Sequence, residues 1–326
     1  MPELPEVTTT VLGLQKEAVD WTISNTWTDL AVNKPSRSDF YDTIKYLPFY
    51  KNFMQIVNGQ KIIDAERRAK NILIHLQNGY TVLIHLKMTG HLMIGQYEFN
   101  KKENKWHVHD DEKNHALRDS YNKYIHFVFE LSKNKKTRHL VFCDARKFGK
   151  ITLIKTSELE TSKHLAGNGP EPIHSNTNKN ILRDISFAEF ENTLNEKYPK
   201  NSKIPIKTFL MDTKTIAGIG NIYSDELLFR AGVHPKSIWV KIPKDIRKKI
   251  YTAMITVLKK GIDFGGDSTS DYRNIYGEPG RFHENHMAYK NKGQKCLQKN
   301  CGGEIVREVI NGRSAHFCNI HQKLYN

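Results

Sequence analysis

The sequence of 326 residues has little cysteine, and most of it lies at one end. Three of the four cysteines lie beyond residue 295, which argues against the spread-out disulfide framework of a secreted protein. No apolar run approaches the ~18 residues that a membrane-spanning helix needs. The sequence also lacks a secretory signal peptide. We therefore expect an intracellular protein, in a bacterial cytoplasm, or in a nucleus if the source is eukaryotic or viral.

Acidic residues are also scarce relative to basic ones. The chain has 35 Asp and Glu against 50 Lys and Arg, which gives a formal net charge of +15 and a pI near 9.4. This excess predicts a polyanionic partner, most simply nucleic acid. An anionic membrane surface is the competing partner, but no basic amphipathic helix is evident.

Periodicity divides the chain into a β-rich first part and a helical later part. Two apolar runs, 72–76 and 82–86, joined by Asn78-Gly79, predict a β-hairpin. Alternating and 3.6-residue apolar spacings predict the other elements: strands at 125–131, 138–143 and 149–154, and helices at about 6–19, 186–197, 204–212, 221–231 and 243–262.

Two polar segments interrupt this pattern. Residues 98–122 lack periodicity, and we expect them to be a solvated loop inserted into the β-rich part. Residues 166–180 are rich in glycine, proline and asparagine and predict an interdomain linker.

The cysteines near the C-terminus have the spacing of a metal site. Cys296-x4-Cys301 and Cys318-x2-His321 are two close pairs separated by the length of a β-hairpin. Tetrahedral Zn²⁺ takes such sulfur and nitrogen ligands in closed structural sites. We predict one structural Zn²⁺ in a zinc ribbon, with His316 as a competitor of His321. Cys143 is expected to be a buried core thiol.

Two further segments suggest chemistry on nucleic acid. Gly218-x-Gly220 joins two expected helices, and the second opens at Asn221, where free N–H groups could hold a phosphate. At the other end of the chain, removal of Met1 would leave Pro2 as a secondary amine with Glu3 behind it. An α-amino group titrates near roughly 8, so Pro2 could attack a sugar C1′ and form an iminium. The alternative is a frayed N-terminus.

Together these segments resemble the family of formamidopyrimidine-DNA glycosylase (MutM) and endonuclease VIII, nearly from end to end. Eight motifs carry the resemblance, in the family's order: MPELPEV at 1–7, ERRAKNIL at 66–73, HLKMTGHL at 85–92, DARKFG at 144–149, GPEP at 169–172, IKTFLMD at 206–212, GIGNIYSDELLF at 218–229 and GRSAHFC at 312–318.

The resemblance implies an α+β multidomain fold. An N-terminal β-sandwich with flanking helices would span 1–165 and contain the insertion. A helix-two-turn-helix DNA-binding domain would span 181–284, and a zinc ribbon built on a β-hairpin would span 285–326. It further implies a monomer that binds double-stranded DNA containing an oxidised base or an abasic site, with no membrane partner.

The resemblance also implies roles for single residues. Pro2 would be the nucleophile and Glu3 the general acid/base, supported by Glu6, Lys70 and Lys207. Those that would contact DNA are Met88, Arg146 and Phe148, which fill the void left by the everted base, and Lys147, Asn221 and Arg313, which bind phosphate. Met88 and Phe148 would otherwise be read as core residues.

The implied activity is that of a bifunctional DNA glycosylase and AP lyase of base excision repair. Leu4 and the Met88/Arg146/Phe148 trio favour oxidised purines, chiefly 8-oxoguanine and formamidopyrimidines. The alternatives are an endonuclease VIII-like glycosylase for oxidised pyrimidines and an inactive DNA-binding zinc protein. Three departures from the family pattern stand out: the C-x4-C spacing with a terminal His321, Lys147 in place of an arginine, and an extra residue near Asp267.

Overall fold

The computed structural model describes residues 1–177, 183–199, 201–269 and 271–326, which form two compact units. Unit 1 comprises Met1–Ala166 together with Gly265–Arg281, and unit 2 comprises Gly167–Phe264 together with Phe282–Asn326. The sequence assigned residues 265–281 to the helical domain, whereas their contacts are with the β-rich unit. Part of the expected linker, 178–180, lies outside the described residues.

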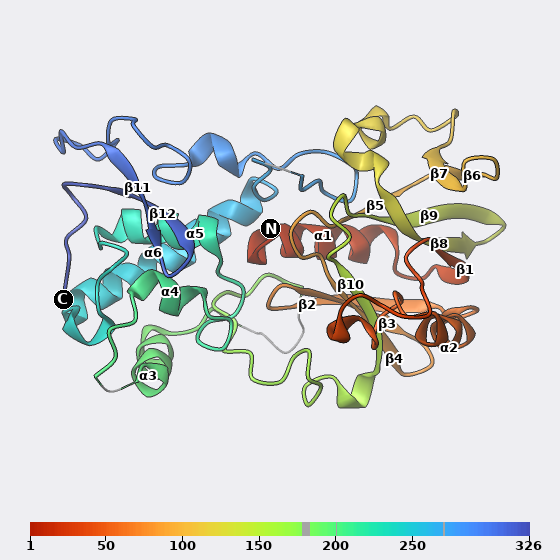
Figure 1. Cartoon of the computed structure of the whole chain (residues 1–326), viewed down its shortest axis with the longest axis horizontal. Coiled ribbons are helices and arrows are strands. Elements are labelled where there is room, and N and C mark those ends of the chain that lie inside the picture. The colour runs from red at the N-terminus through yellow and green to blue at the C-terminus, as the bar shows by residue number, and fades with distance from the viewer. Residues whose placement is uncertain (178–182, 200, 270) are drawn as a thin grey trace. The chain divides into compact units, whose positions relative to one another are not determined.

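Unit 1 is a β-sandwich of two antiparallel four-stranded sheets (Figure 1). One sheet has the order β1-β8-β9-β5, with β1 Thr22–Thr28, β8 Ile125–Lys133, β9 Lys136–Cys143 and β5 His91–Gly95. The other has the order β10-β4-β3-β2, with β10 Lys150–Lys155, β4 Tyr80–His85, β3 Asn71–Leu76 and β2 Ile62–Arg68. Side chains from both sheets enter one apolar core, among them Ile74, Ile84, Phe127 and Phe142. The predicted β-sandwich is therefore confirmed.

Two helices and short 3-10 turns complete the core of unit 1. Helix α1 spans Leu4–Glu17, α2 spans Leu47–Val57, and the 3-10 helices η1 and η4 span Ser38–Phe40 and Thr156–Glu158. Helix α1 has apolar residues at a spacing of three to four, and Val7, Val11 and Leu14 are fully buried in the core. The hairpin between β3 and β4 turns at Gly79, whose φ of +79° suits glycine.

The insertion is folded, and the expectation of a solvated loop was wrong. It forms the hairpin β6 Tyr97–Asn100 and β7 Lys105–Val108, followed by the 3-10 helices η2 His115–Arg118 and η3 Ser120–Lys123. Its Tyr97, Trp106 and Leu117 are buried against Val128 and Val141. These two valines alternate with core-facing phenylalanines along β8 and β9, so the insertion covers the outer face of that sheet.

Unit 2 contains the predicted helices and one hairpin. Its helices are α3 Phe187–Lys197, α4 Ile206–Met211, α5 Asn221–Ala231 and α6 Lys244–Asp263, with η5 Trp239–Lys241 and η6 Phe282–Asn285. Strands β11 Ile305–Ile310 and β12 Arg313–Cys318 pair antiparallel. Each helix begins and ends within one or two residues of its predicted bounds. None of the described helices combines the length and apolar character needed to cross a membrane.

The packing of the insertion makes a prediction about stability. Trp106 is 9% exposed and lies against the rings of Trp27, Phe99 and His139. Trp106→Ala would leave a cavity there and should lower the free energy of unfolding by about 3 kcal/mol, measured by urea denaturation. Lys102→Ala, at the exposed turn of the same hairpin, is the control and should change it by less than about 0.5 kcal/mol. Equal effects of the two variants would contradict the packing assigned to Trp106.

Candidate functional site

The start of the chain is held by the first turn of α1. The backbone N–H of Glu3 donates to Oε2 of Glu6 at 2.7 Å, within a reciprocal capping box of the two residues. Both side chains are nearly inaccessible, at 2% and 1% exposure, and Pro2 is buried as well. The residue expected to be the nucleophile therefore leads directly into two buried carboxylates at a helix N-terminus.

The second oxygen of Glu6 binds the segment that returns from unit 2 to unit 1. Its Oε1 accepts from the N–H of Asp267 at 2.7 Å, and the hydroxyl of Tyr272 donates to the Glu6 carbonyl at 2.9 Å. Gly266 has a φ of +86°, and a Cβ there would lie 2.9 Å from Cγ of Glu6. Only glycine allows this close approach without displacing the carboxylate.

Lys70 lies in the tight turn between β2 and β3. Ala69 has a φ of +54°, and the buried Arg67 donates to its carbonyl at 3.1 Å, which fixes the turn. Lys70 is 7% exposed. Burial, followed by the charges of Lys87 and Lys70, lowers the pKa of His85 to about 3, so this histidine is neutral at physiological pH.

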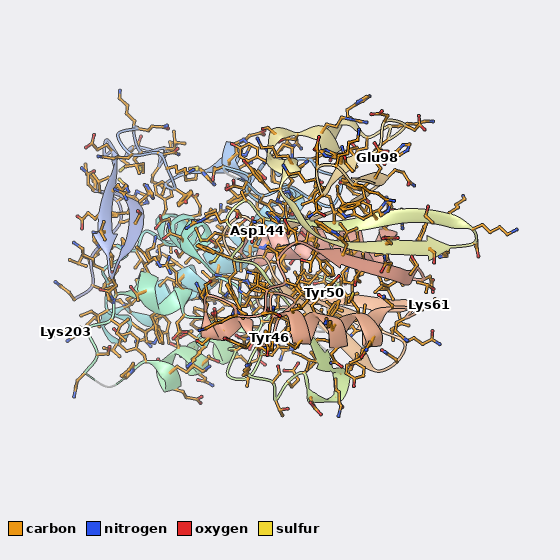
Figure 2. All side chains as sticks on the ribbon, turned by 45° about the vertical axis from the view of Figure 1, so that its right-hand side comes forward. Tyr46, Tyr50, Lys61, Glu98, Asp144 and Lys203 are labelled. Carbon is orange, nitrogen blue, oxygen red and sulfur yellow. The ribbon has the colours of Figure 1, made fainter. Side chains whose placement is uncertain are left out.

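The turn at 144–149 presents an arginine and an aromatic ring to solvent. The fully buried Asp144, labelled in Figure 2, accepts from the N–H of Gly149 at 2.7 Å, from the N–H of Arg146 at 3.3 Å and from the hydroxyl of Thr89. Because Thr89 follows Met88, these bonds join the two turns that carry the predicted void-filling trio.

The trio itself is exposed rather than part of the core. Met88 is 39% exposed, Phe148 is 37% exposed, and the guanidinium of Arg146 lies 4.7 Å from the centre of the Phe148 ring. Between them, Lys147 has a φ of +56°, and its carbonyl accepts from the ammonium of Lys45 at 2.6 Å. Two exposed apolar side chains beside an exposed arginine form a surface that suits insertion into a base stack.

In unit 2, Asn221 and Arg313 come from neighbouring elements. Asn221 is the first residue of α5, after the turn at Gly218 with a φ of +87°, and its Oδ1 has no hydrogen-bond partner among the described residues. Arg313 is exposed at the start of β12, which packs on α5. The positive end of the α5 helix dipole and the guanidinium of Arg313 are two features that attract a phosphate.

Lys207, on α4, contacts residues of both α5 and β12. Its ammonium lies 2.5 Å from Oδ1 of Asp225 and donates to the Ser314 carbonyl at 2.7 Å. Oδ2 of Asp225 accepts from the N–H of His316 at 2.9 Å and lies 3.1 Å from its ring Nδ1. This network holds the residue next to Arg313 against α5. The predicted direct role of Lys207 in the reaction stays a prediction.

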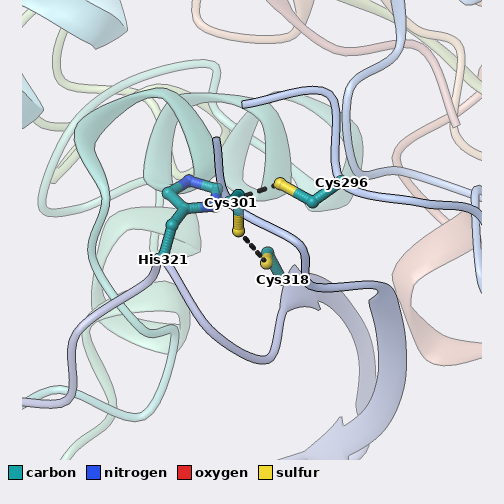
Figure 3. A group of neighbouring side chains, drawn as sticks. All are labelled: Cys296, Cys301, Cys318 and His321. Atoms are coloured by element: carbon teal, nitrogen blue, oxygen red, sulfur yellow. Dashed lines mark hydrogen bonds between the residues drawn. The ribbon is translucent and has the colours of Figure 1, made fainter. Parts of the chain in front are cut away.

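The structure brings the four predicted metal ligands together (Figure 3). The ligand atoms of Cys296, Cys301, Cys318 and His321 all lie within 4.8 Å of one another. Nε2 of His321 lies 3.0 Å from the carbonyl of Phe229, which leaves Nδ1 for a metal. The competing His316 is bound to Asp225 instead. The donor set and its spacing fit a tetrahedral ion.

Comparison with known proteins assigns the chain to a family. Residues 1–151 match the formamidopyrimidine-DNA glycosylase N-terminal domain, and residues 170–273 match the formamidopyrimidine-DNA glycosylase H2TH domain. The chain belongs to the formamidopyrimidine-DNA glycosylase family. The formamidopyrimidine-DNA glycosylase of Desulfitobacterium hafniense is 32% identical over 318 residues, 98% of each chain. That of Heliobacterium modesticaldum is 32% identical over 323 residues, 99% of this chain and all of the relative.

Solved structures of the family share the fold. A complex of Lactococcus lactis Fpg (MutM) with DNA containing N7-benzyl-Fapy-dG matches with a TM-score of 0.76 and 24% identity, over 99% of this chain and 100% of that one. A complex of the same protein with DNA containing an abasic site matches with a TM-score of 0.76 and 24% identity, over 98% and 99%.

Family motifs supplied the predicted site residues, but sequence reasoning did not single out the buried residues that contact their turns and strands. Lys45, Asp144 and Asp225 lie in segments that sequence reasoning examined only for other residues, or not at all. A buried charge has no local sequence signature, although the adjacent Asp225 and Glu226 within α5 hinted at one, since acids are rarely buried without partners.

Lys45 generates a prediction with a defined pH dependence. Burial is the main cause that lowers its pKa to about 8, with Lys150 and Arg37 lowering it further and Asp144 and Asp39 opposing. Its pKa in the unfolded chain is near 10.4, so between about pH 8 and 10 the unfolded chain binds more protons. This residue therefore adds stability as pH rises through that window.

Lys45→Met removes this contribution. Its free energy of unfolding, relative to that of the unaltered protein, should fall by roughly 1–3 kcal/mol between pH 8 and 10 in urea denaturation series. Lys51→Met, at an exposed position of α2, should follow the unaltered protein. Parallel curves for Lys45→Met would show that this lysine is not desolvated in the native state.

Proposed function

We propose that this protein is a bifunctional DNA glycosylase and AP lyase of base excision repair, acting on oxidised purines in duplex DNA, chiefly 8-oxoguanine and formamidopyrimidines. The observation that carries the proposal is the arrangement at the start of α1, where Pro2 leads into the buried carboxylates of Glu3 and Glu6. Membership of the family and the basic net charge of +15 support the substrate class.

The amine of Pro2 supplies the covalent step once Met1 is removed. Its nitrogen forms a bond to C1′ of the damaged nucleotide while the bond from C1′ to the base breaks, and the base leaves with a proton. Glu3 protonates the ring oxygen, which opens the sugar and yields an iminium. The iminium acidifies the C2′ proton, so β-elimination expels the 3′ phosphate. A second elimination expels the 5′ phosphate.

The remaining predicted residues support these steps by position. Lys70 and Lys147, with Asn221 and Arg313, would bind phosphates around the lesion, since each carries donors suited to an anion. An enzyme that acts on a base must take it out of the stack. Met88, Arg146 and Phe148 would occupy the vacated space, with Arg146 facing the orphaned base. Lys207 would act through the network that holds the Arg313 hairpin.

A Zn²⁺ ion held by Cys296, Cys301, Cys318 and His321 would be structural. Four protein ligands complete its coordination, so the ion supplies rigidity and no position for a reacting water. The hairpin of β11 and β12 would then present Arg313 on a fixed frame.

Borohydride trapping tests the amine mechanism. The protein is incubated with a duplex carrying 8-oxoguanine opposite cytosine, with a thymine-glycol duplex alongside, and reduced adducts are counted on a denaturing gel. We expect an adduct on 8-oxoguanine that falls at least about tenfold in Pro2→Gly. A protein with an extra residue ahead of Pro2 is the matched control, because it keeps every side chain but lacks the free proline amine.

Adducts only on thymine glycol would move the protein to the endonuclease VIII-like alternative. Tight DNA binding with no adduct on either duplex would leave a DNA-binding zinc protein without catalysis.

Metal analysis tests the ligand set. The purified protein should contain one zinc per chain, and Cys301→Ser and His321→Ala should each lose most of it and weaken DNA binding. Cys143→Ala is the matched control, because this thiol is fully buried in unit 1, whereas the four predicted ligands belong to unit 2. Full zinc content in Cys301→Ser would refute the assigned ligands.

A further inference from the structure

The insertion contacts the segment that docks on the catalytic end of α1. We define the strap as residues 265–269 and 271–281, and the clasp as residues 114–122. We propose that the clasp holds the strap over the catalytic site, with Asn122 as its central positioning residue, and that this grip serves the base-excision step. The proposal rests on the proposed glycosylase function.

Asn122 is the hub of the clasp. Its side chain is 2% exposed, and its Nδ2 donates to the carbonyl of Ala116 at 2.9 Å and to the carbonyl of Gly277 at 3.2 Å. Its Oδ1 lies 3.0 Å from Nε2 of His91. The two carbonyl partners define which end of the amide carries the nitrogen. One buried side chain thus joins the clasp, the strap and β5.

A second asparagine and a glycine complete the backbone contacts. Nδ2 of Asn114 donates to the carbonyl of Tyr276 at 2.7 Å. Gly277 has a φ of +82°, and a Cβ there would lie 2.9 Å from both the Ala116 carbonyl oxygen and Nδ2 of Asn122. The strap therefore approaches the clasp as closely as only glycine permits.

A charged contact anchors the strap at its centre. Arg273 is 6% exposed, and its guanidinium lies 3.3 Å from the carboxylate of Asp119 and 4.4 Å from the centre of the Tyr121 ring. Figure 1 shows this part of the strap beside η2 and η3. Asp119 and Tyr121 both belong to the clasp, so the insertion supplies the ion pair and the aromatic contact of Arg273.

The strap is also anchored in the core of unit 1. Ile275 is 1% exposed and lies so close to α1 that a Cβ on Gly13 would be 2.3 Å from its side chain. The N–H of Ile94, on β5, donates to the Ile275 carbonyl at 2.9 Å. From this anchor the chain leads back to Asp267, which binds Glu6. The clasp thus holds the middle of a segment whose start reaches the Glu6 carboxylate.

The clasp should affect the two chemical steps unequally. The capping box that places Glu3 is local to α1, so we expect it to persist when the contacts between the clasp and the strap are removed. Displacing a base requires that base to be held while the amine attacks, since misplacement by about 1 Å can cost on the order of 100-fold in rate. Elimination at an abasic site has no base to hold. A strap that covers the site therefore serves excision and not elimination.

Single-turnover assays on two duplexes test this proposal. One duplex carries 8-oxoguanine opposite cytosine, and the other a preformed abasic site. The variants are Asn122→Ala and the milder Asp119→Asn, and Lys102→Ala on the same insertion is the matched control. We expect excision to fall about tenfold or more in Asn122→Ala and less in Asp119→Asn, with abasic cleavage changed less than about twofold. Lys102→Ala should behave as the unaltered protein.

Hydrogen exchange of residues 265–281 provides a readout that does not depend on activity. We expect faster exchange there in Asn122→Ala and Asp119→Asn, with exchange in α1 unchanged. Unchanged exchange in the strap would refute the clasp, and faster exchange with unchanged excision would refute its role in the reaction. An equal fall of both activities would reveal a general structural defect instead. Absence of excision in the unaltered protein would refute the proposed function, while the exchange result would still decide the clasp.

Discussion

The arrangement of unit 1 depends on the carboxylate of Glu6, which is bound at both oxygens. One oxygen accepts from Glu3 and the other from Asp267, a residue 261 positions later in the chain. A buried carboxylate without such donors would cost several kcal/mol of lost hydration. Because the group is 1% exposed, the two bonds offset part of the cost of removing it from water. The start of the chain and the start of the strap are therefore fixed by the same side chain.

Buried acids also support predicted site residues elsewhere, once in each unit. Asp144 binds the backbone of the turn that exposes Arg146, and Asp225 binds the backbone of the strand that begins at Arg313. Each buried acid holds a turn or strand whose exposed side chain carries positive charge. Buried ion pairs contribute little net stability, because desolvation offsets their attraction. Their value here is geometric, since a backbone held from beneath presents its basic side chain in one place.

Local sequence patterns predicted the regular elements well. Helices α5 and α6 and the hairpin of β3 and β4 depend on spacings of a few residues and on turn glycines, so their bounds followed from the sequence. The motifs also supplied the predicted site residues, whose roles stay predictions. The bond from Asp267 to Glu6 could not be predicted, because nothing in either segment specifies a partner 261 residues away.

The prediction for the insertion was wrong for a different reason. Its apolar residues are too sparse to show a period, and only their contact with β8 and β9 orders them. A signal was nevertheless present in β8. The run Phe127-Val128-Phe129 is apolar on both faces of the strand, whereas one face of an antiparallel sheet commonly meets water. A strand of this kind requires a cover on its outer side, and the segment that follows β5 supplies it.

Covering the sheet and holding the strap are linked through one residue. The backbone carbonyl of Asn122 accepts from the thiol of Cys143 on β9, while its side-chain amide binds the Gly277 carbonyl. Through Asn122, the strap is therefore attached to a strand of the sheet and not only to a surface loop. A site built on regular elements keeps its geometry better than one built on loops alone. The insertion thus adds a second contact between the sandwich and the strap, beside the bond from Ile94 on β5 to the Ile275 carbonyl.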